Sequence, residues 1–219
     1  MNDPYPNLTC LRDPIPEIFD AARYLDAAVS AHQAGRHALA DELIRLADIP
    51  AISDWSESLW GKGGPWSRPP LNTEKPPPFV PKEQRIKARM PAKVEIAILL
   101  ARDGFHCRFC GIPLIRAETR MLIRSAYPEA LRWGVRNAEQ HAGFQAMWLQ
   151  YDHLLPHARG GSNELSNMIV TCAPCNNGRS NLTLEEVGLA DPLLRAPARS
   201  TWDGLERFVS WNEAERGRD

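Results

Sequence analysis

Hydrophobic positions recur at helical spacing over residues 16–48, where apolar side chains return every three or four positions. Gly35 interrupts the repeat, so we expect a helical hairpin rather than one long helix. The segment that follows, SDWSESLWG, places Trp55, Leu59 and Trp60 on one side of a short helix. We expect these three side chains either in the core or at a partner surface.

Residues 61–81 break the pattern with seven prolines and three glycines. Proline lacks a backbone N–H and fixes φ, so this composition excludes a helix or a central strand. We interpret the segment as a linker or an extended arm and place a domain boundary there. Trp66 and Phe79 are the side chains that could anchor such an arm to a surface.

The second half of the chain predicts helices mixed with two strands. A basic helix is expected over about 82–102 with an interruption near Pro91, and residues 116–149 are predicted to be helical with a break near Pro128. The remaining predicted elements are strands at 149–155 and 167–171, a helix from about Pro174, and an amphipathic C-terminal helix around residues 202–211. The predicted fold class is therefore α+β and mostly helical.

The distribution of charge adds a candidate interaction surface. The net charge is −1, but residues 1–60 hold ten acidic and four basic side chains, while residues 82–136 hold twelve basic and five acidic ones. The basic half could be the footprint of a polyanion. The alternative is a solvated surface on basic helices.

The expected cellular compartment depends on whether the sequence holds a membrane helix or a signal peptide. No apolar run approaches the roughly 18–20 residues of a membrane helix. The first residues, MNDPYPNLTCLRDP, lack the basic and apolar regions of a signal peptide. We therefore expect a cytoplasmic protein with no membrane partner.

Four of the five cysteines form two C-x-x-C pairs, Cys107 with Cys110 and Cys172 with Cys175. In a reducing compartment such pairs indicate metal more often than a disulfide. Two of these turns can surround one Zn²⁺ with four thiolates and leave no open position, which marks a structural site. The alternatives are a thioredoxin-like redox pair, for which the βαβ context is missing, and four buried thiols.

The segment YDHLLPHARGG carries a second group of polar residues. His153 and His157 are four apart, the spacing of a zinc-protease pair on a helix. Pro156 lies between them and no Glu follows His153, so that interpretation fails. A strand that starts before Asp152 and ends in a Gly-Gly turn fits better.

As a whole, DHLLPHARGGSNELSNMIVTCAPCNNGRSN resembles the HNH endonuclease motif, and RDGFHCRFCG resembles the first zinc knuckle of zinc-stabilised members. The matching positions are Asp152, His153, Pro156, Gly160, Gly161, Asn167, Cys172, Cys175 and Asn176. The likeness covers roughly residues 93–185. The segment between the first knuckle and Asp152 is longer than in compact members.

The resemblance implies a ββα-metal core stapled by the four-cysteine zinc site. By position, Asp152 and Asn176 would ligate a catalytic Mg²⁺ or Mn²⁺. His153 would be the general base, and Asn167 would orient it. Imidazole, which titrates near pH 6.5, suits a base at neutral pH.

We therefore expect a metal-dependent HNH endonuclease that hydrolyses phosphodiester bonds in DNA. Arg159 and Arg179 are candidate phosphate contacts, and the alternative for each is an exposed charge. The alternatives are a non-catalytic zinc-stabilised nucleic-acid-binding or adaptor protein, and an RNA-cleaving toxin on the same scaffold. A pure binder needs none of Asp152, His153 and Asn176. The expected organisation is an accessory or partner-binding helical module at 1–60, a Pro-rich linker at 61–81, a nuclease domain at 82–190 with a helical insertion at about 112–149, and a closing segment at 191–219.

Overall fold

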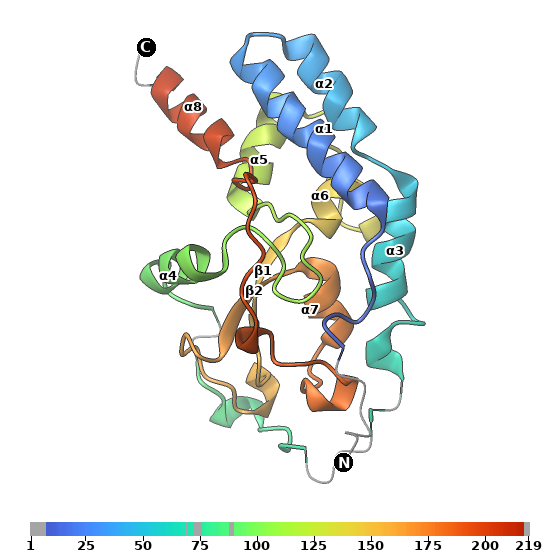
Figure 1. Ribbon diagram of the computed structural model, residues 1–219, viewed down its shortest axis with the longest axis vertical. Helices are drawn as coiled ribbons and strands as arrows, with labels where there is room; N and C mark the ends of the chain where they lie inside the picture. Colours follow the sequence, from blue (N-terminus) through green and yellow to red (C-terminus); the bar gives the residue numbers. More distant parts are fainter. Residues whose placement is uncertain (1–7, 69, 72–75, 88–89, 217–219) are drawn as a thin grey trace.

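The computed structural model of the protein describes residues 8–68, 70–71, 76–87 and 90–216 (Figure 1). In this part of the chain, helices surround one short antiparallel sheet. The helices are α1 (Pro16–Gln33), α2 (His37–Leu46), α3 (Pro50–Trp60), α4 (Lys93–Asp103), α5 (Ala117–Ala126), α6 (Ala142–Ala146), α7 (Ala173–Arg179) and α8 (Glu206–Arg216). The strands are β1 (Leu149–His153) and β2 (Met168–Cys172). The α+β class and the small two-stranded sheet are as predicted.

The N-terminal helical hairpin is confirmed. Gly35 has a φ of +72° in the turn between α1 and α2, a conformation that glycine adopts without steric cost. Trp55 and Leu59 of α3 are buried, so they belong to the core rather than to an exposed partner surface. The buried apolar side chains of these helices and of the second half of the chain form one continuous core. The sequence boundary at 61–81 is therefore not a boundary in the packing.

The two predicted strands and the helix after them form the centre of the molecule (Figure 1). Asp152 pairs with Ile169 and His153 with Met168 in the antiparallel register. Helix α7 begins directly after β2 and packs on both strands. Pro174 is tolerated at its first turn because the N–H groups there have no partner within the helix.

Three predicted helices differ in extent from what the hydrophobic pattern suggested. In the described part of the basic segment the α-helix is Lys93–Asp103, which begins after Pro91, and the Ala92 N–H donates to the Glu95 carboxylate (2.5 Å) at its start. Residues 127–141 between α5 and α6 form no α-helix and contain one short 3-10 turn at Asn137–Glu139. The C-terminal helix starts at Glu206 because the preceding Leu205 has a φ of +62°.

The described residues between Gly61 and Met90, which are the proline-rich segment and the basic stretch after it, lie along the central ββα unit and are called the arm. The Val80 N–H donates to the Ala158 carbonyl (2.9 Å), and the Leu71 N–H donates to the Glu186 carbonyl (2.9 Å). Among the described helices, none is long and apolar enough to cross a membrane.

Candidate metal and nucleic-acid site

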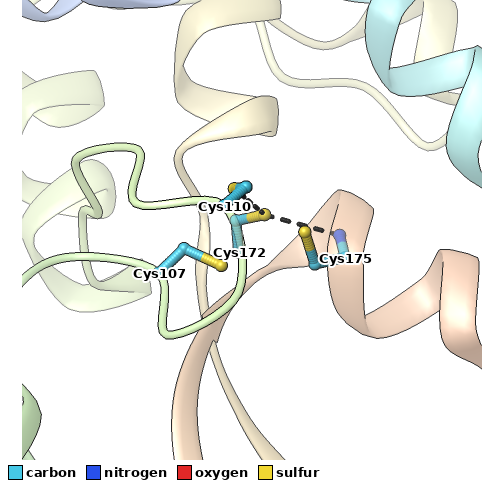
Figure 2. Close-up of side chains that lie close together, drawn as sticks. All are labelled: Cys107, Cys110, Cys172 and Cys175. Carbon is cyan, nitrogen blue, oxygen red and sulfur yellow. Dashed lines mark hydrogen bonds between the residues drawn. The ribbon is translucent and has the colours of Figure 1, made fainter. Parts of the chain in front are cut away.

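The four paired cysteines meet at one point (Figure 2). Their Sγ atoms all lie within 4.8 Å of one another. The first pair sits on a turn in which the Gly111 N–H donates to the Cys107 carbonyl (2.9 Å). The second pair spans the junction of β2 and α7, where the Cys175 N–H donates to the Cys172 Sγ (3.4 Å). The cluster thus connects a loop to the central ββα unit.

The geometry and the chemistry of this cluster fit a zinc ion. Zn–S bonds of about 2.3 Å in a tetrahedron place sulfurs about 3.8 Å apart, and the Sγ atoms of Cys110 and Cys172 are 3.8 Å apart. Burial raises the pKa of the Cys172 thiol, and the neighbouring Cys107 and Cys110 raise it further. Burial also opposes ionisation of Cys107, yet hydrogen bonds from the other three thiols lower its pKa well below the usual value. Four thiolates would therefore need a cation at their centre.

The fifth cysteine, Cys10, lies outside the cluster, and burial raises its pKa to about 11.

A cleft of about 600 Å³ opens beside the end of β1 and the start of α7. Asp152, His153 and Asn176 all line it, so the structure brings together the three residues expected to perform catalysis. Asp152 and His153 are 6% exposed, and Asn176 is half-buried. The Asn176 side chain makes no hydrogen bond within the described part of the chain. Its amide oxygen is thus available to a ligand.

Asn163, rather than Asn167, lies within hydrogen-bond distance of the His153 ring. The His153 Nε2 lies 2.8 Å from the Asn163 Oδ1. Asn167 instead accepts from the Leu155 N–H (2.8 Å) and donates to the carbonyls of Leu155 (3.2 Å) and Ser162 (2.8 Å). The prediction that Asn167 orients His153 directly is therefore wrong. Asn167 holds the loop between the strands, and Asn163 on that loop meets the imidazole.

Arg179 is not a phosphate contact, because its side chain is fully buried. It donates to both Asp152 oxygens at 2.7 Å and to the His153 carbonyl at 2.5 Å. A single arginine from α7 therefore fixes the end of β1 where the two cleft residues lie. The sequence-based role of Arg179 is corrected to a structural one.

This arrangement agrees with one comparison with known proteins. Residues 140–182 match the family model of HNH endonucleases. The chain carries an HNH domain. The match takes in β1, β2 and α7, and with them every residue of the cleft named above. No curated protein and no solved structure matches the chain. The HNH domain indicates a nuclease of that family.

Arg159 of the HNH domain is also buried, which corrects its predicted role as a phosphate contact. Its guanidinium donates to both oxygens of the buried Glu186 carboxylate at 2.8 and 2.9 Å. It also donates to the Pro77 carbonyl (2.5 Å) and lies 4.3 Å from the centre of the Phe79 ring. Phe79 thus contacts the HNH domain, as an anchor would, and Arg159 is one of the residues that hold the arm against it.

The arm supplies basic side chains to the cleft, a position that the sequence alone did not show. Lys82, Arg85 and Lys87 line the cleft together with the acidic Glu83, and both lysines are exposed. The positive balance of residues 82–136 was the available signal. Most arginines of the insertion are engaged elsewhere. Arg116 pairs with Glu206, Arg132 with Asp48 and Arg136 with Glu139, while Arg120 is buried over the Trp133 ring.

Proposed function

We propose that this protein is a metal-dependent endonuclease that hydrolyses phosphodiester bonds in DNA, with His153 as the general base. One observation carries the proposal. Asp152, His153 and Asn176 line a single cleft that is also lined by Lys82, Arg85 and Lys87, beside the acidic Glu83. A polyanionic backbone would be attracted by the basic side chains and presented to the three HNH residues.

The donor set suits a hard divalent cation. Asp152 and Asn176 would hold it through a carboxylate and an amide oxygen, the ligand type that Mg²⁺ and Mn²⁺ prefer. Arg179 occupies part of the Asp152 carboxylate, but two carboxylate oxygens offer about four acceptor positions. When bound, the ion would neutralise charge on the scissile phosphate and stabilise the leaving oxygen.

The contacts of His153 support its role as a base. Because Asn163 offers an amide oxygen at 2.8 Å, the Nε2 of His153 would carry the proton and Nδ1 would accept one from water. Asn163 is itself held by the arm, since its Nδ2 donates to the Met90 carbonyl (3.1 Å). Asn163 is therefore a positioning residue that couples the arm to the base. A reducing cytoplasm, which keeps thiols available for zinc, fits this proposal.

The test is cleavage of supercoiled plasmid DNA with Mg²⁺, with Mn²⁺ and after chelation by EDTA. We expect cleavage with either ion, none with EDTA, and a loss of about 10²–10⁴-fold in His153→Ala. His37→Ala, a histidine outside the cleft, serves as the matched control. The His153→Ala protein should bind DNA like the unchanged protein, because a general base acts on water and not on the phosphate backbone.

Three outcomes would contradict the proposal. If His153→Ala cleaves DNA as fast as the unchanged protein, His153 is not the general base. Binding of DNA without any cleavage would favour the non-catalytic adaptor. Faster cleavage of RNA of the same sequence, run in parallel, would favour the RNA-cleaving alternative.

A further inference from the structure

A second hollow, of about 500 Å³, lies next to the cleft. The two meet at the end of α7. Asn176 lines the cleft, its neighbour Asn177 lines the hollow, and Ser180 lines both. A strand that places one phosphate in the cleft would therefore reach the hollow with an adjacent nucleotide.

The lining of the hollow differs from that of the cleft in kind. It combines aromatic rings with carboxamides, and none of its described lining residues is charged. The rings are Trp60, Trp66 and Trp148, and the carboxamides are Asn137, Gln140, Gln145 and Asn177. Indole rings stack on nucleobases, and carboxamides form hydrogen bonds with base edges. A phosphate would find no basic partner there, whereas a base would find both kinds of contact.

The aromatic wall is rigidly built. The Trp66 Nε1 donates to the carbonyls of Trp60 (2.9 Å) and Gly61 (3.1 Å), although the Trp66 side chain is 43% exposed. The turn that holds it needs glycine, because a Cβ on Gly64 would lie 2.1 Å from the Leu59 carbonyl oxygen. With its N–H already bonded, Trp66 offers the hollow its ring.

A buried polar group also lines the hollow. Gln145 is 3% exposed, and its Nε2 donates to Gln140 (3.1 Å) and to the Asn137 carbonyl (3.3 Å). Its Oε1 accepts no hydrogen bond from any residue that the structure describes. This oxygen lies on the wall of the hollow, where it can accept a hydrogen bond, and the exocyclic amino groups and ring N–H groups of bases are suitable donors.

We propose that this hollow binds the base of an unpaired nucleotide beside the scissile phosphate, so the preferred substrate is single-stranded or locally unpaired. The proposal rests on the proposed nuclease function. A base held in a duplex keeps both faces stacked on its neighbours and could not enter between the tryptophans. The cleft would then hold the backbone, and the hollow would select strands whose bases are free.

The experiment measures binding rather than cleavage, using His153→Ala as the parent protein so that the strand stays intact. The probes are a labelled single-stranded oligodeoxynucleotide, its duplex, and the same strand with abasic positions. We expect the parent to bind the intact strand more tightly than the other two. Trp66→Ala should weaken binding of the intact strand roughly 5- to 150-fold and leave duplex binding almost unchanged. Trp66→Phe should restore most of the loss.

Tyr24→Ala, an exposed aromatic on α1, is the matched control, and each variant is checked for zinc content and thermal unfolding. Equal binding of the intact and abasic strands, or an unchanged affinity in Trp66→Ala, would overturn the base site. Absence of binding to any strand by the parent would also overturn it. Failure of the nuclease proposal is read separately, as the absence of plasmid cleavage by the unchanged protein.

Discussion

The cysteine cluster and the HNH cleft meet on consecutive residues of α7, Cys175 and Asn176, but they are built in opposite ways. The cluster uses four side chains of one kind, three of them buried, and leaves no ligand position for a substrate. The cleft offers two oxygen ligands of different charge and stays open to solvent. A metal that only supports the fold can be enclosed, whereas a metal that meets a phosphate must keep positions for water and substrate.

The comparison also predicts an asymmetry between the two regions. Asn176 follows the zinc-binding turn directly, so loss of the cluster would displace the cleft. The cleft residues contribute no ligand to the cluster, so their replacement should leave the four cysteines in place. Variants of the cluster should therefore affect both regions, whereas variants of the cleft should affect the cleft alone.

The largest expected effect comes from Cys107→Ser. It should abolish zinc binding and with it most of the folded population, because a structural zinc in small domains contributes on the order of 10 kcal/mol of coupled folding free energy. Elemental analysis and thermal unfolding are the measurements. Cys10→Ser, which changes the cysteine outside the cluster, should keep the zinc. Zinc-free protein that unfolds at an unchanged temperature would refute the structural role.

Next in size is Asn176→Ala, which should lose cleavage with every metal while keeping zinc and stability. Asn176→His should retain some cleavage and tolerate Zn²⁺ or Ni²⁺ better, because imidazole is a softer donor than an amide oxygen. The measurement is cleavage rate against metal identity. Cys172, not Asn176, is the N-cap of α7, so if Asn176 had only a structural role, Asn176→Asp and Asn176→Ser would both preserve activity. If Asn176→Ala cleaves at the full rate with Mg²⁺, Asn176 is not a ligand of the catalytic ion.

Smaller effects are expected from Asn163 and Asn167, and they should differ in kind. Asn163→Ala should lower cleavage about 10-fold or more and change the pH–rate profile, because the His153 Nε2 loses the amide oxygen that lies 2.8 Å away. Asn167→Ala should mainly lower the free energy of unfolding, by about 1–3 kcal/mol, because it leaves backbone groups of Leu155 and Ser162 without a partner. Equal pH profiles for Asn163→Ala and the unchanged protein would contradict the positioning role.

The smallest effect concerns the arm. Lys82→Ala and Lys87→Ala should each weaken DNA binding a few-fold, and each should reduce the salt dependence of binding by about one phosphate contact. Cleavage at saturating DNA should change little. Arg36→Ala, an exposed charge far along the sequence from the arm, is the control. An unchanged salt dependence in the double lysine variant would show that these lysines do not contact phosphate.

Much of this organisation could be predicted from the sequence because it is local. The turn at Gly35, both strands and the helix after Cys172 follow from periodicity and from glycine or proline positions. The cysteine pairing was readable because each C-x-x-C forms one turn. These features depend on neighbours within a few residues.

The errors involve partners far apart in the sequence. An exposed and a buried arginine look alike in a sequence, and the carboxylate that pairs with Arg179 lies 27 residues away. Asn163 and Asn167 differ only in their place on a loop, whose geometry decides which one meets His153. The composition of residues 61–81 predicted an extended chain, but could not show that the arm would complete the cleft.

The cysteine cluster has a consequence for the order of folding. Cys110 and Cys172 lie 62 residues apart, and bringing such distant ends together costs about 4 kcal/mol of chain entropy. That loop contains α5, α6 and β1, and α7 starts at its end. If zinc closes the loop, the cleft would be completed only after the ion has bound. A newly made chain would then be harmless to nucleic acid until zinc arrives, so zinc supply would set the time at which the enzyme becomes active.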